Sequence, residues 1–181
     1  MAAPDALDII QMTRPGDARA TVRQEMTDCW ITVTNAGGAA GFPFPPVNAG
    51  HVAPAVDALA DSLHPQRHRV LLARVNGALA GWVSLSRDPS PLIAHWGTVS
   101  HLQTEPAYRG QGIGSTLMRR LRHVARDDMN LEQLHLAVRG GMGLEDFYKA
   151  LGWQVTGRWP RKLRLAPGDT RDEILMILAT L

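Results

Sequence analysis

The residues with the clearest chemical potential form a glycine-rich segment at positions 104–115, here called the glycine loop. It reads Thr-Glu-Pro-Ala-Tyr-Arg-Gly-Gln-Gly-Ile-Gly-Ser, with glycines at 110, 112 and 114. An apolar, extended run precedes it, and a run with helical periodicity, Ile113 to Arg126, follows it. Glycine allows close backbone approach, and the first N–H groups of a helix are unpaired and attract anions. The loop therefore predicts a diphosphate site built from main-chain nitrogens.

Two other phosphate-binding motifs fit the glycine loop poorly. The Rossmann fingerprint spaces its glycines as G-x-G-x-x-G, whereas this loop has G-x-G-x-G. A Walker loop requires a lysine before its Ser or Thr, but here Gly114 directly precedes Ser115. A plain turn with a capping glycine explains one glycine, not three ahead of a helix.

The spacing Arg109-x-x-Gly112-x-Gly114 resembles the acetyl-CoA motif, Q/R-x-x-G-x-G/A, of the GNAT N-acetyltransferase superfamily. The resemblance implies that acetyl-CoA is the cosubstrate and that the loop holds its diphosphate. The residues that it assigns to this role are Arg109, Gly110, Gln111, Gly112, Ile113, Gly114 and Ser115. It further implies that the pantetheine arm pairs like a strand with Leu102, Gln103 and Thr104, where backbone amides polarise the thioester carbonyl.

A second segment carries the same resemblance. Asp146-Phe-Tyr-Lys-Ala-Leu-Gly-Trp153 is similar to the family's x-F-Y-x-x-x-G-F segment, with a tryptophan as its last aromatic residue. On that pattern Tyr148 matches the tyrosine that protonates the departing CoA thiolate. The chemistry is reasonable, because a thiolate accepts a proton or a hydrogen bond from a phenol.

The general base is less clearly marked. Many relatives carry a glutamate or histidine eleven or nine positions before the Gln/Arg of the loop, and Thr98 and Ser100 stand there in this chain. Neither side chain accepts a proton unaided at neutral pH, although together they could order a chain of water molecules. His101 is adjacent, but its side chain has the opposite direction unless a β-bulge intervenes. Thr98, Ser100 and His101 are therefore the candidates.

The resemblance also suggests where the acceptor binds. The family builds this pocket from the first two helices, their connecting loop and the last hairpin. In this chain the corresponding aromatic residues are Trp30, Phe42, Phe44, Trp82 and Trp96, with Asp169, Asp172 and Glu173 as anchors for a cation. Aromatic walls suit a small, partly apolar, cationic amine.

Within the superfamily, the chain is similar to the bacterial tabtoxin-resistance branch. The similarity lies in Gly37 to Phe42, in Leu134-His-Leu, in Phe147-Tyr148 and in the long final hairpin. That branch has acidic residues where this chain has Thr98 and Ala137. We expect acetyl transfer to the primary amine of an antibiotic, toxin, amino-acid-like molecule or polyamine. The alternatives are a protein N-terminal or lysine acetyltransferase and a non-catalytic acyl-CoA sensor.

The elements that must position these residues can be predicted from periodicity. Expected strands cover residues 6–13, 70–75, 79–85, 94–104, 134–138, 153–159 and 173–178, and Asn76-Gly77 indicates a hairpin. Expected helices cover residues 22–33, 113–126 and 144–151, and a further helix has Pro54 at its first position. This order predicts an α/β protein with the GNAT fold: a mixed, mostly antiparallel twisted sheet of six to seven strands flanked by about four helices, over one domain, 1–181.

Composition excludes several classes. The 181 residues carry a net charge of +2 and one cysteine, Cys29, and show neither metal-ligand spacing nor a basic-aromatic stripe. We therefore expect no metal and no nucleic-acid partner. No apolar run is long enough to span a membrane, and the first residues lack the pattern of a secretory signal, so we expect a cytoplasmic protein. A monomer and a homodimer both remain open.

Overall fold

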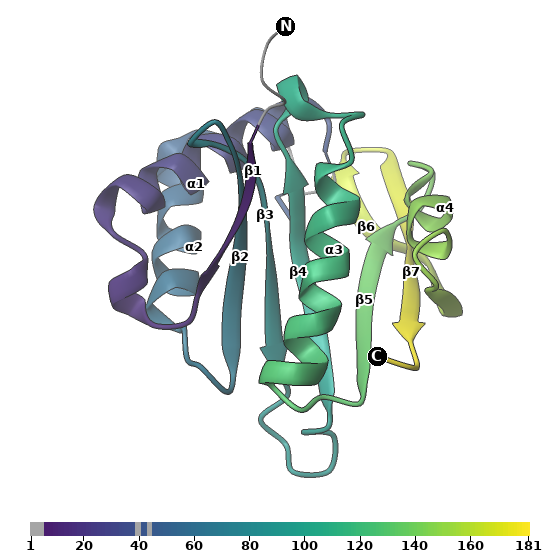
Figure 1. Ribbon diagram of the computed structural model, residues 1–181. Helices are drawn as coiled ribbons and strands as arrows, with labels where there is room; N and C mark the ends of the chain where they lie inside the picture. Colours follow the sequence, from purple (N-terminus) through teal and green to yellow (C-terminus); the bar gives the residue numbers. More distant parts are fainter. Residues whose placement is uncertain (1–5, 39–40, 43–44) are drawn as a thin grey trace, which may run out of the picture.

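The central feature of the computed structural model is one mixed sheet with helices on both faces (Figure 1). The structure describes residues 6–38, 41–42 and 45–181, which form seven strands and four α-helices. In chain order these are β1 (Leu7–Met12), α1 (Ala20–Asn35), α2 (Ala49–Asp61), β2 (His68–Val75), β3 (Ala78–Arg87), β4 (Trp96–Thr104), α3 (Ile113–His123), β5 (Gln133–Arg139), α4 (Leu144–Lys149), β6 (Gln154–Ala166) and β7 (Asp169–Leu178). The expected α/β architecture is confirmed.

The strand order is β1-β2-β3-β4-β5-β7-β6, and all neighbours are antiparallel except β4 and β5. The parallel pairing joins only Trp96–Thr98 to Gln133–His135. Beyond that point β4 continues beside β3, and β5 continues beside β7. The two central strands therefore separate, and backbone groups near the end of β4 face no neighbouring strand on the β5 side. Such an edge is what the family resemblance implies, because it places the pantetheine arm like a strand along Leu102, Gln103 and Thr104.

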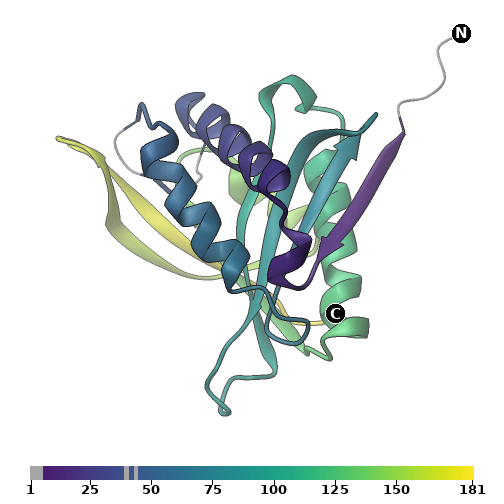
Figure 2. The same cartoon turned by 90° about the vertical axis from the view of Figure 1, so that its left-hand side faces the viewer.

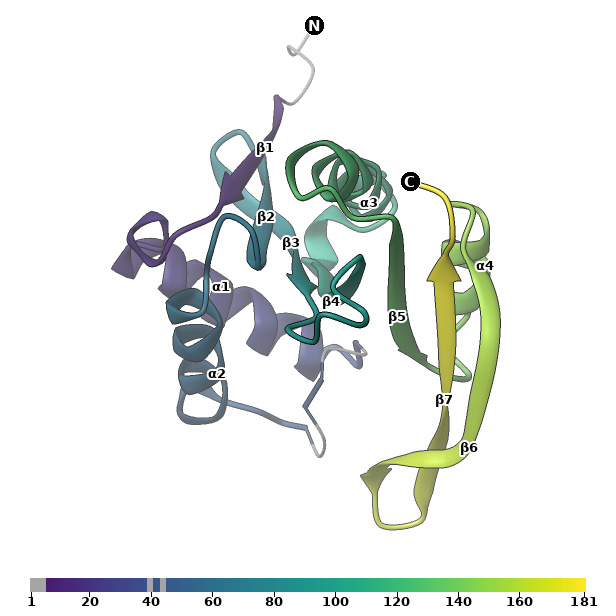
Figure 3. The same cartoon turned by 90° about the horizontal axis from the view of Figure 1, so that it is seen from below.

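Helices cover the two faces of the sheet in pairs, α1 with α2 and α3 with α4 (Figure 3). One apolar cluster fills the face under α3 and α4, where Ile113, Leu117 and Leu121 follow helical spacing. The other cluster fills the face under α1 and α2 and includes Met26 and Trp30. The long β6–β7 hairpin projects beyond the sheet on the side of α2 (Figure 2).

The tight turn at Asn76-Gly77 is confirmed, because both residues have positive φ, 50° and 85°, and connect the antiparallel strands β2 and β3. The prediction for Pro54 is wrong. Helix α2 begins at Ala49, and Pro54 lies within it. The capping arrangement at Asn48, whose backbone N–H donates to His51 Nδ1 at 3.2 Å, starts the helix one turn earlier.

Candidate functional site

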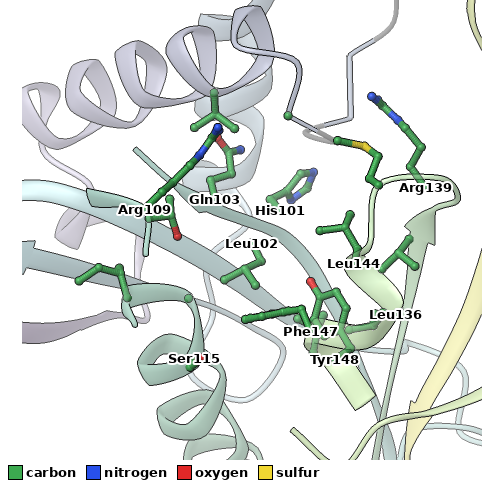
Figure 4. A pocket seen from close by; sticks show the side chains of 18 of the residues that line it. His101, Leu102, Gln103, Arg109, Ser115, Leu136, Arg139, Leu144, Phe147 and Tyr148 are labelled. Carbon is green, nitrogen blue, oxygen red and sulfur yellow. The ribbon is translucent and has the colours of Figure 1, made fainter. Parts of the chain in front are cut away.

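A cavity of about 730 Å³ opens where β4 and β5 separate (Figure 4). Its walls come from the ends of both strands, the glycine loop, the first turn of α3, helix α4 and the end of α1. The cavity brings together most residues that the sequence singled out: Ser100, His101, Leu102, Gln103, Thr104, Arg109, Gly110, Gly112, Ile113, Gly114, Ser115 and Tyr148. Gln111 is not among the lining residues, and its side chain donates to the Ala107 carbonyl oxygen at 3.3 Å.

The glycine loop has the geometry of an anion site. Gly112 precedes α3 in the left-handed conformation, with φ 78° and ψ 7°, and Gly110 has φ 78°. A Cβ at either position would meet no protein atom within 4 Å, so the space beside both glycines is open to a ligand. Within the described chain, the backbone N–H groups of 110–115 have no acceptor, and the first helical bond is Thr116 N to Gly112 O, 2.9 Å. These free donors at a helix start fit a diphosphate.

The end of β4 contains a β-bulge. Ser84 faces Ser100 and Trp82 faces Gln103, so β4 has one more residue than β3 between these pairs. The extra residue places His101 at φ 58° and turns its ring toward the α1 face, where its centroid lies 4.8 Å from that of Trp30. The condition that the sequence set for His101 is met, because the bulge brings this side chain to the cavity.

Ser84 contacts Nδ1 of His101 and can orient its ring. Ser84 Oγ donates its single hydrogen to the Ser100 carbonyl oxygen at 3.1 Å, and it also lies 3.2 Å from His101 Nδ1. In this arrangement Nδ1 can carry a hydrogen and donate it to Ser84 Oγ, and Nε2 is then the nitrogen that can accept a proton. Burial among aromatic rings, with a smaller contribution from the nearby His68, lowers the pKa of His101 to about 4. The imidazole is therefore neutral at physiological pH.

Tyr148 reaches the cavity from α4, on the other face of the sheet. The side chain is nearly buried, with 7% of the residue exposed, and its hydroxyl points into the cavity (Figure 4). The rings of Phe147 and Trp153 pack edge-on against it, with centroids 5.0 and 5.9 Å away. Burial raises the pKa of Tyr148 above its usual value. The phenol therefore keeps its proton at neutral pH and can donate it.

Gln103 adds an unusual polar group to the wall of the cavity. The residue is 1% exposed, yet neither its amide nitrogen nor its amide oxygen has a hydrogen-bond partner among the described residues. Buried amides are nearly always paired, so an unpaired amide beside a cavity is a group available to a ligand. Its backbone, together with Leu102 and Thr104, forms the edge of β4 that faces no strand.

Several predicted site residues lie elsewhere. Thr98 is located where β4 and β5 still pair, and its Oγ1 forms a hydrogen bond with His135 Nε2 at 2.8 Å. Trp96 begins the same strand and contacts the His135 ring. Trp82 is 0% exposed and lies behind His101 in the core. The expectation that Trp82 and Trp96 line the acceptor pocket is corrected: one is core, and the other is at the closed end of the strand pair.

Two of the remaining aromatic candidates, Trp30 and Phe42, form a layer behind His101. Trp30 is buried and packs edge-on against Phe42, with centroids 4.9 Å apart. Phe42 lines a second, adjoining cavity. Phe44 lies outside the described residues. Two residues that the sequence reasoning missed belong to the site: Ser84, which orients His101, and Arg139, which ends β5 and lines both cavities.

Two further observations concern membrane-spanning helices and metal-binding groups. Over the described residues, helices long and apolar enough to cross a lipid bilayer are not found. In the same part of the chain, no group of three or more His, Cys, Asp or Glu side chains is arranged to hold a metal ion.

Comparison with known proteins agrees with this geometry. Residues 27–153 match the model of the acetyltransferase (GNAT) family. Similar structures include an acetyltransferase of the GNAT family from Streptococcus pneumoniae, with 21% identity, TM-score 0.71, and coverage of 96% of this chain and 99% of that one. Another is yncA from Salmonella typhimurium, solved with its cofactor acetyl-CoA, with 19% identity, TM-score 0.69, and coverage of 96% and 94%.

A third similar structure is the ribosomal-protein-S18-alanine N-acetyltransferase from Escherichia coli, with 16% identity, TM-score 0.71, and coverage of 97% and 96%. At these identities the likeness establishes the fold. No curated protein matches the sequence.

Proposed function

Because the chain belongs to the acetyltransferase (GNAT) family, we propose that it transfers the acetyl group of acetyl-CoA directly to the primary amine of a small molecule. One observation carries this proposal: a single cavity connects the free N–H groups of the glycine loop to Tyr148 and to His101. It therefore joins a diphosphate site, a proton donor and a proton acceptor. The neighbour yncA, which holds acetyl-CoA on the same fold, supports the choice of donor.

The proposed binding of the donor uses the edge of β4. The glycine loop receives the diphosphate, and the arm extends along Leu102, Gln103 and Thr104 toward the point where the strands separate. Backbone N–H groups that face no strand can donate to the thioester carbonyl oxygen and stabilise the negative charge that develops there. The cosubstrate supplies an activated acyl group, and the protein orients it.

The proposed chemistry assigns one role to each face of the sheet. The neutral amine attacks the carbonyl carbon, so that a C–N bond forms and the C–S bond breaks. Nε2 of His101 accepts the proton that the amine nitrogen loses, and Tyr148 gives its hydroxyl proton to the leaving sulfur. Proton exchange with solvent then restores both side chains. Ser100 lines the cavity beside His101 and can order a water molecule there, whereas Thr98 is occupied by His135.

The proposal is tested by incubating the protein with acetyl-CoA and a panel of primary amines while free thiol is followed. Thiol release that depends on one or more small amines, with the acetylated amine identified by its mass increase, is the expected result. Release only with peptides that carry a free N-terminus or a lysine would identify a protein acetyltransferase instead. Tight binding of acetyl-CoA without thiol release for any amine would favour the sensor alternative.

A further inference from the structure

A second cavity, of about 590 Å³, adjoins the first on the side of the sheet that faces α1. It is formed by the loop after α1, the turn after β5 and the tip of the β6–β7 hairpin, which extends past α2 (Figure 2). The two cavities share the residues Gly37, Gly38, Arg139 and Met142. The two cavities therefore adjoin each other, with Arg139 at their boundary.

Arg139 is a cation that forms no direct ion pair with any carboxylate of the described chain. Its Nε is buried and has no hydrogen-bond partner there, and no described carboxylate forms an ion pair with its guanidinium. Burial, with a smaller contribution from Arg171, lowers the pKa of Arg139, and the carboxylate of Asp169 partly offsets this shift. Arg171 itself pairs with Asp169, from Arg171 Nε to Asp169 Oδ1, at 2.7 Å. A half-buried guanidinium in this position is set up to receive an anion.

The acidic residues that the sequence suggested as anchors for a cation are already engaged. Asp172 accepts hydrogen bonds from Arg158 Nη1 at 3.0 Å and from the Arg161 backbone N–H at 2.9 Å. Glu173 forms an ion pair with Lys162. The structure thus corrects the expectation of a cation site at the hairpin, because cross-strand pairing satisfies these carboxylates.

The charges on the first cavity are complementary to an anionic acceptor. Its described walls contain two permanently charged side chains, Arg109 and Arg139, and no carboxylate. Arg109 lies at the glycine loop, where the proposed donor places its phosphates. Arg139 lies at the other end, on the same face of the sheet as His101, and its side chain extends toward the loop after α1 (Figure 4). The second cation therefore belongs to the acceptor side.

Building on the proposed function, we propose that Arg139 binds a carboxylate of the acceptor, so that the substrate is an amino acid or a similar molecule carrying both an amine and a carboxylate. The planar guanidinium donates two parallel hydrogen bonds to a carboxylate, which orients the molecule as well as attracting it. With the carboxylate at Arg139, the amine is directed toward Nε2 of His101. The second cavity then has room for the side chain of the acceptor.

The test compares each of the twenty L-amino acids with its carboxamide, in which only the charge is removed. In the presence of acetyl-CoA, we expect at least one acid to be acetylated with a kcat/KM tenfold or more above that of its amide. In Arg139→Gln this ratio should fall to about one, mainly because kcat/KM for the acid decreases. The KM for acetyl-CoA should stay unchanged. Equal use of acids and amides by the wild type, or an unchanged ratio in Arg139→Gln, overturns the inference while leaving acetyl transfer intact.

Two measurements do not depend on turnover. Calorimetric titration of the CoA-bound protein with the same acids and amides should show binding of an acid that weakens tenfold or more in Arg139→Gln, and absence of binding by every acid overturns the inference. Arg139→Met keeps an unbranched, apolar side chain in place of the arginine methylenes and removes the charged guanidinium. Its Tm without ligand should equal or exceed that of the wild type, because a buried cation without a partner is unfavourable. A lower Tm would show a structural role instead.

Discussion

Replacing Gly112 by alanine tests whether the left-handed turn of the glycine loop is needed for acetyl-CoA. Gly112 has φ 78° and ψ 7°, a conformation that costs an L-residue about 1–2 kcal/mol more than it costs glycine. No protein atom lies within 4 Å of the added Cβ, so the penalty is conformational and not steric. Because nothing packs on this turn, the variant can relax in the free state, and binding must then restore the strained form. The dissociation constant for acetyl-CoA should rise roughly 5- to 30-fold.

Gly77→Ala is the matched control. Gly77 has φ 85°, also has no atom within 4 Å of an added Cβ, and lies in the β2–β3 turn away from the cavity. It should lose about 1–2 kcal/mol of stability, roughly 2–8 °C in Tm, with unchanged affinity for acetyl-CoA. Affinities come from calorimetric titration and stabilities from thermal unfolding. A dissociation constant for Gly112→Ala within twofold of the wild type would refute the diphosphate assignment of this turn.

Two further predictions concern the proton donor and the proton acceptor. Tyr148→Phe should lower kcat about 100-fold or more and leave the affinity for acetyl-CoA unchanged, because only the proposed proton donor is lost. Tyr108→Phe, at the other tyrosine of the cavity, is the control. Equal turnover of the two variants would show that Tyr148 takes no part in the chemistry. In the unfolded chain His101 binds a proton below about pH 6.5, whereas in the folded chain it does so only below about pH 4. As the pH falls from 6.5 to 4, the wild type should therefore lose up to roughly 3 kcal/mol of stability relative to His101→Asn. Denaturant unfolding at pH 7 and pH 4.5 measures this difference, and parallel pH profiles of the two proteins would contradict the buried, neutral histidine.

Local signals predicted the parts of the site that depend on nearby residues. The three glycines, the helix that follows them and the Asn76-Gly77 turn each depend on backbone conformation within a few positions, which residue type reports directly. The α/β order followed from the same kind of signal. Ion pairs between residues that are distant in the sequence were harder to predict. That Asp172 and Glu173 are neutralised by Arg158 and Lys162 depends on the register between β6 and β7, which periodicity does not reveal.

The aromatic residues show a second limit of sequence reasoning. Trp30, Trp82 and Trp96 were grouped because their type suits a cleft, but a tryptophan suits a core equally well. Burial separates them: Trp82 and Trp30 support the cavity from behind, and Trp96 lies at the closed end of β4. Whether such a residue lines the cavity depends on its position relative to the point where β4 separates from β5.

The bulge at His101 left a signal that could have been read. Gly81 lies within β3, opposite the end of β4, and a Cβ there would be 2.4 Å from the Gln103 carbonyl oxygen. A glycine inside an apolar strand indicates a bulge or a close approach of backbones. Gly81 therefore marks a close approach of β3 to the end of β4, but it does not show which strand carries the extra residue.

The separation of β4 and β5 explains how one cavity contains both the proposed proton acceptor, His101, and the proposed proton donor, Tyr148. In a closed sheet, side chains on opposite faces are separated by the backbone layer. Here His101 belongs to the α1 face and Tyr148 to the α4 face, yet both line the same space because no strand lies between them. In direct acyl transfer, the amine adds to one face of the thioester, and nitrogen and sulfur then occupy two different positions on the tetrahedral carbon. In the proposed mechanism, an arm laid along the open edge of β4 would meet the amine beside His101 on one face and place its sulfur near Tyr148 on the other.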